Sequence, residues 1–226
     1  MKIIAVVQAR MKSTRFPNKA MKKINDTPLI QILLSRLSKS IYIDDIILAT
    51  SKDNSNLPLI SHVSKLGYPY EIGSEEDVLD RYLQASKKHR AEIVVRITGD
   101  CPLVDPLIVD HCIKELINSN VDYCTNTYPP TFPDGFDVSV MSINALKKAA
   151  KDATDKFDRE HVTSYIKKNN YFSKKNIESN HDWSMLRLTI DNPEDYEVIS
   201  QVFKHFSPNI YFSWHDVIKL YKKNPS

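Results

Sequence analysis

The chain has 226 residues, of which 42% are hydrophobic and 26% charged, enough for one large domain with a sizeable core. Its three cysteines are odd in number and form no C-x-x-C pair, which argues against a disulfide framework and favours a reducing compartment. Only five apolar residues separate Lys2 from Gln8, too few for a signal-peptide core or a membrane span. We therefore expect a cytoplasmic protein with no membrane partner.

The net charge of +3 is unevenly distributed. Residues 1–25 carry seven lysines and arginines and no acidic residue, which leaves a net charge of −4 for the other 201 residues. This cluster predicts an anion-binding site near the start of the chain. Aromatic residues are not interleaved with these cations and the remaining chain is acidic, so we expect no nucleic-acid partner.

Short β-branched runs alternate with amphipathic stretches over the first 125 residues. Strands are predicted at 3–7, 46–50 and 93–98, with weaker signals at 68–72 and 121–125. Helices are predicted at 28–40, 57–66, 76–89 and 106–118. Thr27 and Asp105 each precede a proline and are expected to cap the helices that follow them. The alternation predicts a three-layer α/β fold with a mostly parallel sheet.

The pattern changes after residue 125. Residues 126–137 are rich in turn formers, and strands are expected at 138–141 and 186–190. Helical patterns occupy 144–151, 159–168, 193–206 and 214–222. Because no linker or repeat interrupts the chain, we expect one domain over 1–226 with an insertion around 126–185.

Several common catalytic motifs are absent from the sequence. With four glycines in the whole chain, there is no G-x-G-x-x-G and no G-x-x-x-x-G-K-[ST], which excludes those dinucleotide and phosphate sites. There is also no H-E-x-x-H, G-x-S-x-G or Cys/His cluster. Zinc hydrolysis and serine-triad chemistry therefore lose their usual support.

A cationic loop follows the first predicted strand. Its sequence is Gln8-Ala9-Arg10-Met11-Lys12-Ser13-Thr14-Arg15-Phe16-Pro17-Asn18-Lys19. Ligands of open α/β sheets bind outside the carboxyl ends of the strands, where this loop lies. Four cations and two hydroxyls within ten residues suit a polyphosphate, although a solvated basic turn is the alternative that the loop alone leaves open.

Two carboxylates follow other predicted strands. Asp100 lies in Thr98-Gly99-Asp100-Cys101-Pro102-Leu103, where it would suit Mg²⁺ beside a triphosphate, or would simply end the strand with an Asx-turn. Asp191 precedes Glu194 by three residues, a capping-box spacing that helix capping explains and that does not preclude metal ligation. Both the structural and the functional interpretation stay open at each position.

The stretch Gly73-Ser74-Glu75-Glu76-Asp77-Val78-Leu79-Asp80-Arg81 has the same ambiguity. Ser74 is expected to cap a helix, and Asp77 and Arg81 are spaced as an i, i+4 ion pair. Surface stabilisation therefore explains this stretch as well as ligand binding does.

In their order along the chain, these motifs and Asp191-Asn192-Pro193-Glu194-Asp195 resemble the cytidylyltransferase family. The likeness is to the branch called spore-coat polysaccharide biosynthesis protein F, related to the enzymes that make CMP-sialic acid and CMP-Kdo. It extends from Lys2 to about Phe206. The resemblance implies a Rossmann-like nucleotide-diphospho-sugar transferase fold, with a small insertion for acceptor binding and for a homodimer interface.

The resemblance also implies roles for single residues. CTP would be bound by Gln8, Ala9, Arg10, Ser13, Thr14, Arg15, Lys19, Ser74, Arg81 and Thr98. Mg²⁺ would be held by Asp100 and Asp191, and the catalytic groups would be Arg10, Lys19 and Asp100. The residues expected near a sugar acceptor are Asp134, Asp137, Arg159, Glu160, His161 and Arg187.

The chain departs from the family pattern in two places. Many members have glycine where this chain has Lys12 and Asn18, so Asn18 is expected to accept a left-handed backbone conformation. Thr98 stands where the enzymes that make CMP-Kdo have glutamine, which leaves base recognition by that side chain, and a strict preference for CTP, open.

The implied activity is the Mg²⁺-dependent transfer of CMP from CTP to an acidic sugar or related glycan precursor, with release of pyrophosphate, in surface polysaccharide biosynthesis. One alternative is a nucleotide-sugar-dependent glycosyltransferase of the related fold. Asp134-Gly135-Phe136-Asp137 has the wrong spacing for its D-x-D metal motif. The other is a non-catalytic nucleotide-binding protein, which would have no reason to keep two carboxylates facing a triphosphate.

Overall fold

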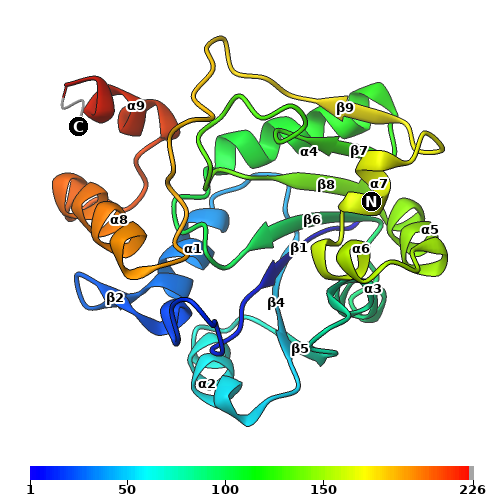
Figure 1. Ribbon diagram of the computed structural model, residues 1–226, viewed down its shortest axis with the longest axis horizontal. Coiled ribbons are helices and arrows are strands. Elements are labelled where there is room, and N and C mark those ends of the chain that lie inside the picture. The colour runs from blue at the N-terminus through cyan, green and yellow to red at the C-terminus, as the bar shows by residue number, and fades with distance from the viewer. Residues whose placement is uncertain (224–226) are drawn as a thin grey trace.

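The computed structural model describes residues 1–223, which contain a seven-stranded mixed sheet of order β5-β4-β1-β6-β8-β7-β9 (Figure 1). In chain order these strands are β1 (Ile3–Gln8), β4 (Asp45–Ser51), β5 (Tyr70–Gly73), β6 (Ile93–Thr98), β7 (Tyr123–Thr125), β8 (Ser139–Ser142) and β9 (Lys174–Asn176). Strand β8 runs antiparallel to both of its neighbours, and the other pairings are parallel. The predicted mostly parallel sheet is confirmed.

Helices cover both faces of this sheet (Figure 1). One buried cluster joins the sheet to α1 (Leu29–Leu37), α2 (Leu57–Lys65), α4 (Pro106–Ser119), α8 (Pro193–Phe206) and α9 (Trp214–Lys223). The other joins it to α3 (Val78–Lys88), α5 (Ile143–Asp152) and α7 (Ser164–Lys168), beside which lies α6 (Lys156–His161). The predicted three-layer architecture is therefore confirmed.

Strand β1 is buried on both faces of the sheet, which explains why its sequence is a continuous run of apolar residues. Ile3, Ala5 and Val7 face one cluster, whereas Ile4 and Val6 face the other. A strand covered on both faces cannot alternate polar and apolar residues without burying unpaired polar groups.

Residues 126–185 contribute β8 and β9 to the same sheet, together with α5, α6 and α7. Two predictions in the second half of the chain were wrong. The predicted strand 186–190 forms an isolated bridge between Asp134 and Arg187 and bends at Thr189. The predicted helix 159–168 is split between α6 and α7 at Val162, which has a φ of 60°.

The two predicted proline-preceded caps differ in outcome. Asp105 caps α4, because its carboxylate accepts a hydrogen bond of 2.8 Å from the backbone N–H of Leu107. Thr27 does not cap α1: it lies in β3 (Thr27–Pro28), which forms a small hairpin with β2 (Lys23–Ile24), and the helix begins at Leu29. Pro28 occupies the N-cap position instead, and it has no side-chain acceptor.

In the described part of the chain, residues 1–223, no helix combines the length and apolar character that crossing a membrane requires.

Arg36 fixes the segment that follows β6. Its side chain is buried and donates hydrogen bonds to the carbonyl oxygens of Leu103, Val104 and Ile210. The guanidinium also lies 4.8 Å from the ring centre of Phe212. A buried cation with this many acceptors stabilises one arrangement of the surrounding loops.

Gly99 lets the ends of β1 and β6 approach closely. Its backbone N–H donates to the carbonyl oxygen of Gln8 at 2.7 Å. A Cβ atom at position 99 would lie 2.7 Å from the Cβ of Ala9 and 2.8 Å from the Gln8 oxygen. Glycine is therefore required where the two strand ends present Arg10 and Asp100.

We expect Gly99→Ala to reduce the free energy of unfolding by about 1–3 kcal/mol, because the added methyl overlaps Ala9 and Gln8. Chemical denaturation measures this loss. The double variant Ala9→Gly/Gly99→Ala removes the nearest obstructing atom and should recover part of it. Wild-type stability in the single variant would contradict this account.

Candidate active site

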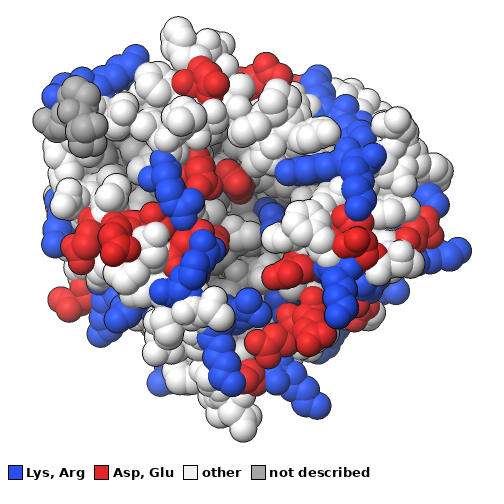
Figure 2. Space-filling model, viewed as in Figure 1, with Lys and Arg blue, Asp and Glu red and all other residues white. Residues whose placement is uncertain are grey.

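A cavity of about 300 Å³ lies at the carboxyl ends of β1 and β6. Figure 2 shows this face hollowed near its centre, with acidic and basic side chains gathered around the hollow. The cavity is lined by Gln8, Ala9, Arg10, Ser13, Thr14, Arg15, Lys19, Ala20, Thr98, Gly99, Asp100, Glu160 and Asp191. Eight of the ten residues predicted to bind nucleotide thus line one cavity with both predicted metal ligands.

Backbone contacts hold the cationic loop in place. The N–H of Met11 donates to the side chain of Asn56 at 2.8 Å, and the N–H of Asn18 donates to the carbonyl of Met11 at 2.8 Å. Asn18 has a φ of 61°, the left-handed conformation expected of a residue that stands in place of glycine. Lys12 pairs with Asp53 at 2.6 Å and points to that side of the loop, away from the cavity lining.

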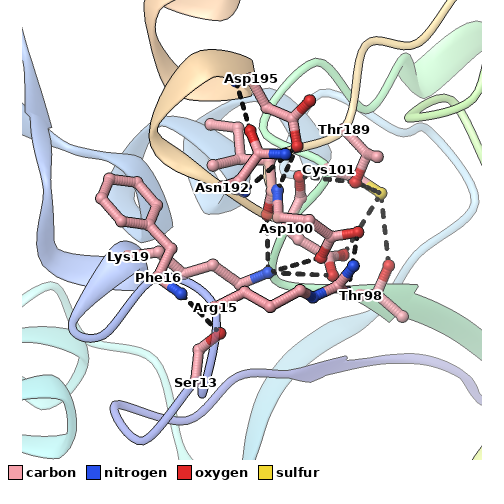
Figure 3. A network of polar contacts seen from close by, with 12 residues as sticks. Ser13, Arg15, Phe16, Lys19, Thr98, Asp100, Cys101, Thr189, Asn192 and Asp195 are labelled. Atoms are coloured by element: carbon pink, nitrogen blue, oxygen red, sulfur yellow. Dashed lines mark hydrogen bonds and ion pairs between the residues drawn. The ribbon is translucent and has the colours of Figure 1, made fainter.

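Lys19 joins the two carboxylates that the sequence singled out (Figure 3). Its Nζ lies 3.3 Å from a carboxylate oxygen of Asp100 and 3.1 Å from one of Asp191. It also donates to the backbone carbonyl of Ile190 at 2.6 Å. The Lys19 side chain is 14% exposed, so this ammonium is largely shielded from water, where its attraction to both acids is strongest.

Asp191 is surrounded by three cations. Besides Lys19, Arg15 lies 3.1 Å and Arg187 2.9 Å from its carboxylate. Burial alone would raise the pKa of Asp191, but hydrogen bonds from Arg187 and Lys19 and the charges of Lys19 and Arg15 outweigh burial and lower it. The carboxylate is therefore ionised at neutral pH.

The capping box of α8 lies one residue later than the sequence spacing predicted. The side chain of Asn192 accepts from the N–H of Asp195 at 2.8 Å, and the Asp195 carboxylate accepts from the N–H groups of Asn192 and Asp191. The predicted box of Asp191 with Glu194 is wrong. Asn192 and Asp195 form the capping box of the helix (Figure 3), so the Asp191 carboxylate is not used for capping and lines the cavity.

The segments that carry the two acids are tied together through their backbones. The N–H of Ile190 donates to the carbonyl oxygen of Asp100 at 2.9 Å, and the hydroxyl of Thr189 donates to the same oxygen at 3.2 Å. Among residues 1–223, the contacts of the Asp100 carboxylate are Lys19 and the thiol of Cys101, not a backbone N–H. The Asx-turn alternative for Asp100 is therefore not what the structure contains.

A second cavity of about 580 Å³ shares Gln8, Arg10 and Glu160 with the first, and the remaining two predicted nucleotide residues, Ser74 and Arg81, are not in its lining. Arg81 is 1% exposed, donates to the carbonyl of Ser74, and packs its stem against Gly73. Burial lowers the pKa of Arg81. Neither Ser74 nor Arg81 lines the first cavity.

The predicted local contacts around α3 are also different. Asp77, not Ser74, is the N-cap of α3, and its carboxylate accepts from the N–H of Asp80 at 2.9 Å. The expected ion pair of Asp77 with Arg81 is wrong, because Asp77 pairs with Arg159 across 82 residues of sequence.

The residues predicted near the acceptor fall into separate places. The Arg159 guanidinium donates hydrogen bonds to the carboxylate of Asp77 and to the backbone carbonyls of Ala150 and Ala153. These contacts connect α6 to α3. Glu160 lines both cavities already described. His161 is exposed, with its ring centre 4.2 Å from that of Phe157.

Asp134 and Asp137 line a third cavity of about 350 Å³, which also contains Arg96 and Lys167. Burial and the negative charge of Asp134 raise the pKa of Asp137 to about 6, against the opposing charges of Arg96 and Lys167. Asp134 is paired with Arg187 at 3.2 Å. The sequence analysis missed Arg96 and Lys167, although a cation inside the apolar run 93–97 was a signal for the first.

Gly135 makes the turn between these two acids possible. It has a φ of 109°, and a Cβ there would overlap the carbonyl group of Leu188. Only glycine adopts this backbone conformation without strain and lets the turn lie against the segment that carries Arg187.

Comparison with known proteins decides the family. Residues 4–216 match the family described as cytidylyltransferase. The chain belongs to the cytidylyltransferase family. It is 32% identical over 231 residues to the spore coat polysaccharide biosynthesis protein SpsF of Bacillus subtilis (strain 168), covering 99% of this chain and 95% of that protein.

Solved structures agree with this assignment. A cytidylyltransferase from Leptospira borgpetersenii serovar Hardjo-bovis (strain JB197) superposes with a TM-score of 0.95 at 33% identity, covering 100% of this chain and 95% of that one. A CMP:2-keto-3-deoxy-manno-octonic acid synthetase solved with CTP has a TM-score of 0.72 at 15% identity, covering 91% and 99%. The second likeness shows that this cytidylyltransferase has the predicted nucleotide-diphospho-sugar transferase fold.

Asp137 makes the stability of this cytidylyltransferase depend on pH. Its pKa is about 6 in the fold and about 3.9 in an unfolded chain, so the folded state holds the proton more tightly. The contribution of Asp137 to stability should fall as pH rises from about 4 to 6 and stay reduced above that range. Asp134, Arg96, Lys167 and Asp100 are the charged groups that act on it.

We therefore expect Asp137→Asn to increase the free energy of unfolding at pH 8 by about 2 kcal/mol and to flatten the decline between pH 4 and 6. Urea denaturation over that pH range measures both effects. Exposed Asp26→Asn controls for the loss of one negative charge. A variant less stable than the wild type at pH 8 would show that Asp137 is held by favourable contacts instead.

Proposed function

We propose that this cytidylyltransferase transfers CMP from CTP to an acidic sugar or related glycan precursor and releases pyrophosphate, as a step of surface polysaccharide biosynthesis. The observation that carries the proposal is the convergence of the loop cations with Asp100 and Asp191 in one cavity. The similarity to a spore coat polysaccharide protein over the whole chain supports the pathway. The structural likeness to a synthetase solved with CTP supports the nucleotide.

Each of the two adjoining cavities would hold a different part of a nucleoside triphosphate. The first, with Arg10, Ser13, Arg15 and Lys19, suits the phosphates, because several fixed donors and cations are needed to match their charge. The nucleoside is assigned to the second cavity, whose lining includes Glu75, Glu76 and Asp77, the residues that follow Ser74. Arg10 lines both and lies where the two parts would join.

The carboxylate pair fits a magnesium ion that arrives with the nucleotide. Mg²⁺ is commonly held by one or two carboxylates together with waters and substrate phosphates. Residues 1–223 contain no group of three or more acidic, histidine or cysteine side chains placed to hold a metal by themselves. We assign Asp100 and Asp191 as the two protein ligands. A bound Mg²⁺ would supply charge neutralisation at the phosphate that reacts.

The chain's own cations have a separate task in the reaction. An oxygen of the acceptor attacks the α-phosphorus, and the bond between that phosphorus and the oxygen bridging to the β-phosphate breaks. Negative charge grows on the departing pyrophosphate. Arg10, Arg15 and Lys19 line the cavity and would stabilise that charge.

The setting of the reaction is part of the proposal. Three buried, unpaired thiols, Cys101, Cys112 and Cys124, favour the reducing cytoplasm. We also propose a single catalytic domain over 1–226 and a homodimer that uses residues 126–185, on the strength of the family resemblance. Sedimentation equilibrium tests the dimer.

The reaction class is tested by a pyrophosphate-release screen of the four nucleoside triphosphates against acidic sugars, with and without Mg²⁺. We expect release with CTP, an acidic sugar and Mg²⁺ together. Asp100→Asn should lower turnover about 10²-fold or more, because one of the two acids at the reacting phosphate is neutralised. The exposed Asp182→Asn is the matched control. Tight CTP binding without pyrophosphate release from any acceptor would favour a non-catalytic nucleotide-binding protein.

Lys19 is expected to compete with a metal ion for the two carboxylates. In the absence of nucleotide, its ammonium already contacts both acids, so Mn²⁺ should bind the wild type weakly. Lys19→Met should bind Mn²⁺ at least tenfold more tightly without nucleotide, while pyrophosphate release falls about 10²-fold. Calorimetry measures the binding, and the exposed Lys23→Met serves as control. Unchanged Mn²⁺ affinity in Lys19→Met would remove Asp100 and Asp191 from the metal site.

A further inference from the structure

Glu160 lies where the two cavities assigned to the nucleotide meet. Among residues 1–223, it is the one carboxylate that lines both cavities, and it shares that position with Gln8 and Arg10. Gln8 ends β1 and Arg10 follows it, whereas Glu160 comes from α6, a helix that contacts α3 and α7 (Figure 1). The junction of the cavities thus brings together a strand end and a helix that is distant from it in the sequence.

The backbone that ends α6 is strained. Val162 has a φ of 60° and a ψ of −58°, and the N–H of Thr163 donates to the carbonyl oxygen of His161. These angles and this hydrogen bond define the rare, strained kind of γ-turn. A positive φ is especially unfavourable for a β-branched residue, and the Val162 side chain is fully buried. Such strain persists only where surrounding contacts hold it, and it concentrates at functional sites.

Contacts from two neighbouring helices hold this strained segment in place. Asp158 is buried, and its carboxylate accepts a hydrogen bond of 2.6 Å from the hydroxyl of Ser164 in α7. The Arg159 guanidinium donates to the carboxylate of Asp77 at the start of α3, at 2.7 Å. Glu160 directly follows these two anchored residues, so its backbone position is fixed although its side chain is exposed.

No contact of the Glu160 carboxylate within the protein explains why the backbone is held in this way. Within residues 1–223, no hydrogen bond or ion pair involves that carboxylate, which is exposed at the cavities. It also does not form a group of three with Asp100 and Asp191 that could hold a metal ion in that part of the chain. The oxygens of Glu160 are therefore available to a ligand at the junction.

The other acids of the second cavity are placed differently. Asp77 pairs with a guanidinium of α6, and Glu75 lies 3.6 Å from Arg10. Glu76 lines the second cavity but not the first. Glu160 is thus the acid that combines a position at the junction with oxygens that no cation of the described chain occupies.

We propose that the Glu160 carboxylate accepts hydrogen bonds from the ribose hydroxyls of the nucleotide. The inference rests on the proposed function, because it uses the assignment of the phosphates to the first cavity and of the nucleoside to the second. In a nucleoside triphosphate the ribose connects those two parts, so it occupies the junction. An ionised carboxylate has acceptor oxygens and no donor, and the ribose offers two neighbouring hydroxyl donors. Glu160 therefore distinguishes ribonucleotides from nucleotides that lack these hydroxyls.

The negative charge of Glu160 strengthens this selection. A carboxylate close to a triphosphate repels it, so the placement opposes binding unless the ligand brings donors that compensate. Ribose hydroxyls supply that compensation, whereas a nucleotide without them experiences only the repulsion. The same group thus favours the correct sugar and opposes the incorrect one.

The test compares CTP with 2′,3′-dideoxy-CTP, which has the same base and phosphates and lacks both hydroxyls. Calorimetry measures the binding of each nucleotide with Mg²⁺ and without acceptor, so the test needs no turnover. The variants are Glu160→Ala and Glu160→Gln. Glu197→Ala, at an exposed position of α8 outside both cavities, controls for the loss of one negative charge. Thermal unfolding of each variant reports whether it is folded.

We expect the wild type to bind CTP at least tenfold more tightly than the dideoxy analogue. Glu160→Ala should bring the two affinities to within about twofold, because CTP loses its hydrogen bonds while the analogue is no longer repelled. Glu160→Gln keeps an acceptor oxygen without the charge, so it should retain part of the preference. A merely structural role of Glu160 would weaken the binding of both nucleotides alike.

Equal affinities of the wild type for the two nucleotides would overturn this inference, and so would an unchanged ratio of affinities in Glu160→Ala. A loss of turnover in Glu160→Ala with that ratio unchanged would also overturn it and would place Glu160 at the acceptor, as the family resemblance implied. These results leave cytidylyl transfer by the wild type intact. Discrimination that depends on Glu160, without pyrophosphate release from any acceptor, would count against the proposed function and support this inference.

Discussion

The ammonium group of Lys19 is the contact on which the arrangement of the site depends. Asp100 and Asp191 belong to segments 91 positions apart in the sequence, and their negative charges repel each other at short range. The Lys19 ammonium contacts both carboxylates, which offsets part of that repulsion, and it also donates to the backbone carbonyl of Ile190. The cationic loop is thus attached to the strand end and to the start of α8 at one point.

A second set of contacts holds these acids in place. Arg187 contacts Asp134, Asp191 and Asp195, and so connects the turn before β8 to the first turn of α8. The Asn192–Asp195 capping box fixes the helix independently of Asp191. Each carboxylate near the cavity therefore has a different partner set, which allows Asp191 to face Lys19 while Asp195 serves the helix.

Strong local signals made most of the fold predictable. The apolar run of β1 and the proline-led start of α4 depend on residues that are neighbours in sequence. The strand β9 escaped prediction because Lys174-Lys175-Asn176 has no apolar alternation and pairs only at the sheet edge. The segment 186–190 was wrongly predicted to be a strand because its residues are apolar. These residues are buried in the core without pairing in the sheet.

The candidate site was predictable as a set of residues but not as contacts. The sequence placed loop cations and two acids at strand ends, and strand order brought them together. Arg96 and Lys167 lie at one cavity because α7 folds against β8. No local sequence pattern predicts this packing. The separation of Arg159 from Asp134 likewise depends on the long-range pair of Arg159 with Asp77.

Strand β6 also fixes the spacing of the side chains near its carboxyl end. A β-strand hardly stretches, and each step of two residues on one face is about 7 Å. The spacing of Arg96 from Thr98 is therefore set by the backbone of the strand, whereas Asp100 lies in the turn that follows. A shift of one residue in the pairing of β6 with β1 would move both side chains to the opposite face of the sheet, so the lining of the cavities depends on strand register.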